Sequence, residues 1–155
     1  MTRPLLRLFA YAGAAALGTT LTACSSNDVQ ARSLAARLTL MQTAPAAYAQ
    51  AKAGLTTADI VLSGVPERIS RLDATGLQPG TSYTGRYHLG RCTPSGSELG
   101  TAVGEALNMT ATSSSLTLRQ VQALGGVSAA QAFALYQVTP EGQTPLLCVN
   151  LSERG

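Results

Sequence analysis

The chain has no tryptophan, a single histidine and few charges, with Lys, Arg, Asp and Glu together making up 12% of its 155 residues. One histidine, His88, is too few for a site that needs several imidazoles from one chain, and no GxSxG elbow presents a serine nucleophile. No basic run is interleaved with aromatic residues, which argues against a nucleic-acid groove and a polybasic membrane patch. The sequence also lacks a GxxxxGKS/T phosphate loop, so nucleotide chemistry is disfavoured.

What the N-terminus does contain is an apolar run that ends in Leu21-Thr22-Ala23-Cys24. Arg3 and Arg7 supply the positive region of a signal peptide, and the apolar stretch 8–17 is shorter than the roughly 20 residues of a membrane-spanning helix. The tetrapeptide resembles the bacterial lipobox. In that motif the cysteine is acylated on its thiol and becomes the first residue of the mature chain.

The lipobox resemblance divides the chain into three parts. We predict a signal peptide over 1–23, a tether over 24–32 that is anchored to the membrane through lipid on Cys24, and one domain over 33–155. This implies a cell-envelope location, facing the periplasm or the exterior. The alternative is an ordinary secretory signal cut near Ala23, with a cysteine after it by chance.

The two remaining cysteines, Cys92 and Cys148, are predicted to form a disulfide, because an exported protein folds in an oxidising compartment. In the chain-entropy view so long a loop contributes roughly 4 kcal/mol to stability. The alternative is a pair of thiols or metal ligands. Neither cysteine belongs to a CxxC motif and no histidine cluster is available to complete a zinc site, so the disulfide is favoured.

Alternation of apolar and polar residues indicates that the domain is mainly β. Turn signals rich in Pro and Gly occur at 77–80, 94–96 and 140–142, a spacing typical of a sandwich or barrel. Five runs have the character of strands: 36–41, 59–65, 81–89, 115–118 and 133–138.

Two segments are also candidates for short helices. Residues 44–53 are rich in alanine, and 117–125 place Leu118, Val121 and Leu124 at helical intervals before a glycine pair. The second candidate competes with the strand expected at 115–118, and periodicity over so few residues cannot decide between them.

Four short motifs resemble a known family. Gly76-Leu77-Gln78-Pro79-Gly80, Gly85-Arg86-Tyr87-His88 and Gly90-Arg91-Cys92 are similar to the GL-x-PG, GFH-x-H and G-x-C segments of copper/zinc superoxide dismutases and of related CHRD-type domains. Leu147-Cys148-Val149-Asn150-Leu151 resembles the family strand that carries the second cysteine. The resemblance spans about residues 58–151 and implies a Greek-key β-sandwich, immunoglobulin-like or superoxide-dismutase-like, in which Cys92 pairs with Cys148.

The metal ligands of that family are mostly missing from this chain. The family holds copper with four imidazoles and zinc with three imidazoles and a carboxylate, one imidazole being shared. This sequence has Tyr87 at the first copper position, or His88 if the register shifts by one residue, and Tyr136 near another. Pro145 stands where the family carries the arginine that guides superoxide. We therefore expect neither a metal cofactor nor catalysis.

The resulting functional prediction is a binding or structural module with an unidentified protein or small-molecule partner. The alternative is a copper- or zinc-binding enzyme or carrier with a reduced site, in which His88 is the candidate ligand. Such a site could be built across a dimer, with one His88 from each chain. A third hypothesis is a ligand-binding face formed by tyrosines, which needs at least two of them to be exposed. Aromatic residues on strands more often pack into a core, so packing is favoured. The tyrosines concerned are Tyr48, Tyr83, Tyr87 and Tyr136.

Overall fold

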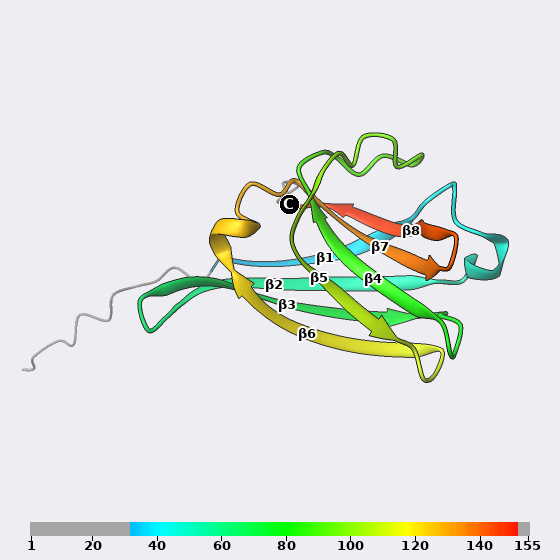
Figure 1. Cartoon of the computed structure of the whole chain (residues 1–155), viewed down its shortest axis with the longest axis horizontal. Coiled ribbons are helices and arrows are strands. Elements are labelled where there is room, and N and C mark those ends of the chain that lie inside the picture. The colour runs from blue at the N-terminus through cyan, green and yellow to red at the C-terminus, as the bar shows by residue number, and fades with distance from the viewer. Residues whose placement is uncertain (1–31, 152–155) are drawn as a thin grey trace, which may run out of the picture.

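The computed structural model describes residues 32–151, which form eight antiparallel strands in one nearly closed sheet (Figure 1). Two short 3-10 turns, η1 (Ala46–Tyr48) and η2 (Leu124–Gly126), interrupt the loops. The strands are β1 (Arg32–Leu40), β2 (Lys52–Leu62), β3 (Val65–Thr75), β4 (Ser82–His88), β5 (Ala102–Thr110), β6 (Ser115–Ala123), β7 (Ala132–Thr139) and β8 (Gly142–Asn150).

The strands follow a Greek-key order, β5-β4-β7-β8-β1-β2-β3-β6. β1, β2 and β3 are joined as a simple meander, whereas β6 lies beside β3 and β7 lies beside β4. The connections from β3 to β4 and from β6 to β7 therefore cross between strands that are not neighbours. This confirms the predicted mainly β, Greek-key class, with a single barrel-like sheet as its form.

The two edge strands, β5 and β6, approach one another and almost close the barrel through side chains. Gln122 on β6 accepts a hydrogen bond from the backbone N–H of Glu105 on β5 at 2.9 Å, in place of a backbone ladder. Gly104 makes this approach possible, because a Cβ atom there would lie 2.7 Å from the Gln122 Oε1 atom, and its φ is +71°. An amide side chain thus covers strand edges that would otherwise be open.

Aromatic side chains fill the inside of the barrel. The Tyr87 and Phe133 rings pack edge to face with centroids 5.1 Å apart, and Gly85 leaves the space that Phe133 occupies. At the other end Tyr48 and Tyr83 pack edge to face and share a hydrogen bond of 3.1 Å between their hydroxyls. The polar tip of each of these two tyrosines is therefore satisfied within the core.

Four of the five predicted strand runs are confirmed. Residues 36–41, 81–89, 115–118 and 133–138 coincide with most or part of β1, β4, β6 and β7. The run 59–65 is wrong as a single strand, because it contains the turn between β2 and β3, where Ser63 and Gly64 have φ values of +51° and +82°. Apolar residues flank this turn on both sides, but Ser63-Gly64 is itself a turn signal and separates the two strands.

The two candidate helices are reduced to single 3-10 turns. Residues 44–53 contain only the single turn η1 before β2 begins at Lys52, and 117–125 belong mainly to β6, with η2 following it. β6 pairs with β3 residue by residue from Ser115 to Ala123. That continuous ladder outweighs the helical spacing of three apolar residues, so the competing strand prediction is the correct one.

The predicted signal peptide over 1–23 and the acylated Cys24 lie outside the described residues, as does the tether apart from its last residue. Arg32 already belongs to β1, where it pairs with Asp59 of β2.

Candidate functional site

His88 and Tyr136 meet on the outside of the barrel. Successive residues of a strand point to opposite faces of the sheet, so His88 points outward because Tyr87 fills the core. Tyr136 comes from the neighbouring strand β7, and its hydroxyl lies 2.8 Å from the Nε2 atom of His88. His88 is only 5% exposed. The structure therefore brings together two residues that the family resemblance singled out.

Both ring nitrogens of His88 have hydrogen-bond partners. The Nδ1 atom lies 3.2 Å from the carbonyl oxygen of Gly100, which can only accept, so Nδ1 carries the proton and donates it. Nε2 of the neutral ring is then the acceptor for the Tyr136 hydroxyl. Burial lowers the pKa of His88 and raises the pKa of Tyr136, and both shifts favour this neutral arrangement.

The loop 89–101 covers this pair and is tied down at its base. Cys92 forms the predicted disulfide with Cys148 on β8, with Cα atoms 5.7 Å apart. Asn150, also on β8, accepts a hydrogen bond from the Cys92 backbone N–H at 2.8 Å and donates one to its carbonyl at 3.2 Å. An apolar layer between loop and barrel excludes water and comprises Met41, Leu99, Ala132, Ala134 and Cys148.

The electrostatic surroundings of His88 do not favour a cation. Arg86 lies two residues earlier on the same outer face of β4, and its positive charge adds to the lowering of the His88 pKa. Tyr87, the other residue considered at the first copper position, is fully buried in the core. Pro145 pairs with Tyr136 in the sheet register and brings no charge. Within residues 32–151, no three His, Cys, Asp or Glu residues lie together as a metal site requires.

The tyrosines do not form an exposed binding face. Tyr48, Tyr83 and Tyr87 are each at most 1% exposed, and only Tyr136 is partly accessible. The hypothesis of an aromatic ligand face needed two exposed rings and is wrong. The packing interpretation is confirmed for the three buried rings.

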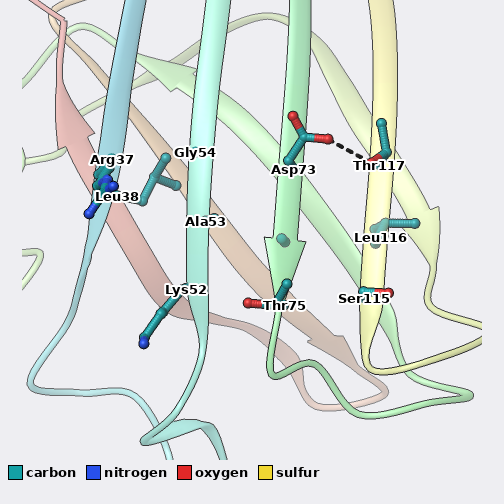
Figure 2. Close-up of a pocket in the computed structure, with 11 residues that line it drawn as sticks. Arg37, Leu38, Lys52, Ala53, Gly54, Asp73, Thr75, Ser115, Leu116 and Thr117 are labelled. Carbon is teal, nitrogen blue, oxygen red and sulfur yellow. Dashed lines mark hydrogen bonds between the residues drawn. The ribbon is translucent and has the colours of Figure 1, made fainter.

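A second site was not predicted from sequence: a depression of about 670 Å³ over β1, β2, β3 and β6 (Figure 2). Gly54 contributes no side chain at its centre, between Arg37 on one side and Asp73 on the other. Asp73 accepts a hydrogen bond from Thr117 at 2.6 Å and pairs with Arg71 at 2.9 Å. Those contacts, led by the Thr117 hydrogen bond, lower the pKa of Asp73.

The two cations of this depression are free to meet an anionic group. Arg37 and Lys52 are exposed, and neither forms an ion pair with any residue in the part of the chain that the structure describes. Each of the four strands contributes only a few residues to the lining of the depression, so no contiguous sequence motif could have revealed this site.

A polar cluster inside one end of the barrel was also missed. Arg68 on β3 binds Asp59 on β2 with two hydrogen bonds of 2.6 and 2.8 Å and donates a third to the carbonyl of Val127 at 3.2 Å. Its guanidinium also lies 5.6 Å from the centre of the Tyr87 ring, whose hydroxyl shares a 2.6 Å hydrogen bond with Ser70. The hydrogen bond with Asp59 is the main cause of the raised pKa of Arg68. The cluster closes the barrel end.

Comparison with known proteins found no matching family model, no matching curated protein and no matching solved structure. Across residues 32–151 there is no helix with the length and apolar character needed to cross a membrane.

Proposed function

We propose that this protein is a lipid-anchored module of the cell envelope, built on a superoxide-dismutase-like barrel that serves binding or structure and performs no metal chemistry. The observation that carries this proposal is the state of His88. Its two ring nitrogens are occupied by Gly100 and Tyr136, so neither offers a free lone pair to a metal. Framework and catalysis are separable on a common fold, and this chain keeps features of the framework.

Four features of the framework support the resemblance. The segment 76–80 forms the turn before β4, the segment 85–88 lies on β4, and the two cysteines join the β4–β5 loop to β8. The strand order is a Greek key, as the resemblance implies. The disulfide thus holds the loop whose Gly100 carbonyl accepts a hydrogen bond from His88.

The position of β1 suits a protein held by its N-terminus. β1 follows the proposed tether and lies between β8 and β2, so it is hydrogen-bonded on both sides. A pull transmitted from lipid on Cys24 would therefore act on an interior strand of the sheet. Two or more acyl chains hold a protein stably on a membrane, whereas one does so only marginally.

The alternative is copper or zinc bound at a reduced site. For that, the Nε2 atom of His88 would have to exchange the Tyr136 hydroxyl for the metal, and the ion would sit near the positive charge of Arg86. A metal site shared by the His88 residues of two chains would also need this side chain to reach the surface. In the structure His88 is only 5% exposed.

The proposal is tested on the full chain, expressed with its signal sequence in bacteria supplied with copper and zinc. We expect mass spectrometry to find acylated Cys24, and a Cys24→Ala variant to move from the detergent phase to the aqueous phase. We expect metal content well below one atom per chain and no dismutation of superoxide. Stoichiometric copper or zinc that is lost in His88→Ala would overturn the non-metal part, and unmodified Cys24 in membrane-targeted protein would overturn the anchor.

A further inference from the structure

Exposed apolar side chains are concentrated at one end of the barrel. Of the six large hydrophobic residues that are exposed within residues 32–151, three lie together in the β2–β3 hairpin. They are Val61, Leu62 and Val65, with exposed fractions of 44%, 57% and 52%. Isolated exposed hydrophobics are normal, but such a group of neighbours indicates a contact surface.

The hairpin projects beyond the strands on either side of it (Figure 1). Among residues 32–151, β1 pairs with β2 as far as Asp59, and β6 pairs with β3 as far as Glu67. Within that part of the chain, the residues of β2 and β3 beyond these positions pair only with each other, through Val61 and Leu62 to the turn. The described tip is therefore a narrow two-stranded ribbon.

The turn at the tip is compact and open to its surroundings. Ser63 and Gly64 both have positive φ, as in a two-residue hairpin turn, and a Cβ atom on Gly64 would have no neighbour within 4 Å. Leu62 and Val65 are directly paired across the strands, so their side chains lie side by side on the outer face. The ribbon thus presents an apolar pair at its very end.

The apolar surface has a clear lower limit. The next outward row toward the barrel contains Ile60 and Glu67, about 7 Å from the Leu62 and Val65 row at 3.3 to 3.4 Å per residue. A carboxylate belongs at the level of polar headgroups and not among acyl chains. Insertion of the ribbon into a bilayer would therefore be shallow and confined to its last few residues.

The occupant of this surface follows from where the chain enters the barrel. Arg32, the first described residue, pairs with Asp59, three residues before Leu62. The eight residue steps from Cys24 to Arg32 span at most about 29 Å when fully extended. If Cys24 carries lipid, as the proposed function requires, the hairpin end of the barrel is kept within that distance of the bilayer.

We propose that the tip of the β2–β3 hairpin inserts into the bilayer that holds the Cys24 lipid and gives the barrel a fixed orientation on the membrane. This inference rests on the proposed lipid anchor. The anchor raises the local concentration of the hairpin at the membrane, so a weak apolar contact is sufficient. The opposite end of the barrel, with the β5–β6 turn, would then face away from the membrane.

The test uses the full-length lipoprotein, purified and reconstituted into vesicles of phosphatidylethanolamine and phosphatidylglycerol. An environment-sensitive fluorophore is attached to Ser63→Cys at the tip, and to Ser113→Cys in the β5–β6 turn as the matched control. The register places these turns at opposite ends of the β3–β6 pair. We expect a blue shift and quenching by lipids with brominated acyl chains for Ser63→Cys only. Equal, water-like emission from both positions would overturn the inference.

Two further measurements separate the explanations. Replacing Leu62 and Val65 by Asn in the labelled protein should abolish the quenching, whereas Leu89→Asn, at another exposed apolar residue, should leave it unchanged. Mass spectrometry of the same sample reports acylation of Cys24. Acylated protein with a water-exposed tip would overturn the insertion alone, and protein without lipid would overturn the anchor. A tip that is shielded in detergent together with a doubled mass would assign the surface to a second copy and overturn the inference.

Discussion

At the scale of single residues, burial and hydrogen bonding give His88 a structural role. An imidazole is the side chain best suited to proton transfer near neutral pH, but this one is covered by a loop and hydrogen-bonded at both nitrogens. Tyr136, which the family resemblance would place near a metal-ligand position, donates a hydrogen bond from its hydroxyl to His88. Each ring nitrogen of His88 therefore has a hydrogen-bond partner, and neither is left to bind a metal.

The stability of the protein should fall with decreasing pH because of His88. Burial lowers its pKa in the folded state below the ordinary value of 6.5, so the unfolded chain binds more protons in the interval between the two values. The free energy of unfolding is therefore fully retained above pH 6.5 and declines as the pH falls toward the folded-state pKa. Urea denaturation at a series of pH values would measure this decline.

The matched variant is His88→Gln, which keeps a polar side chain at this position but does not titrate. Its unfolding free energy should lack the decline that the parent shows below pH 6.5. Parallel pH profiles for the two proteins would contradict the assignment, as would an NMR titration that places the His88 pKa at or above its ordinary value.

At the scale of elements, the barrel is closed at one seam by side chains. Gln122 spans from β6 to β5, and Gly104 gives it room. A glycine at such a place has two separable roles, since it relieves both backbone strain at positive φ and steric contact. The chain offers a control for this distinction at Gly80, which has a φ of +77° and open space around it.

Replacing Gly104 by Ala should destabilise the protein more than replacing Gly80 by Ala. Both variants lose about 1 kcal/mol because alanine is strained at positive φ. Only Gly104→Ala places a methyl group against Gln122 and Val127, which adds roughly 1–3 kcal/mol for overpacking. Chemical denaturation of the two variants gives the comparison. Equal losses would show that β5 and β6 are not held together by this contact.

At the scale of the whole molecule, the disulfide and the β1–β8 pairing join the two halves of the chain. Cys148 carries the disulfide from β8 to the loop over His88, and its neighbour in the register is Thr39 of β1. The N-terminal strand, the C-terminal strand and the loop over His88 therefore meet at one place.

Replacing both Cys92 and Cys148 by Ser should lower the free energy of unfolding by about 2–4 kcal/mol, since the bridge closes a loop with a sequence separation of 56 residues. We expect the β-sheet circular dichroism to be retained, because the ladders and the aromatic core do not depend on the bridge. An unchanged denaturation midpoint would contradict a structural role for the disulfide.

The sequence by itself determined the class of the fold and several of its parts. Alternating residues predicted β1, β4 and β6, because a half-buried strand imposes a period of two on its own residues, and a short apolar and aromatic run predicted β7. The pairing of Cys92 with Cys148 follows from the count of two remaining cysteines in an exported chain, and the family resemblance implies the same pair. The strand patterns can be read locally because the residues that produce them are neighbours in the chain, whereas the disulfide is predicted by counting.

Tertiary structure decided what depends on partners distant in sequence. β3 is not predicted because Arg68 and Ser70 occupy inward positions, and only Asp59 and Tyr87 from other strands satisfy them there. In the same way His88 is a closed unit only because β7 brings Tyr136 to it across 48 residues. Burial of a polar group is tolerated when its partner is present, and a linear pattern carries no record of that partner.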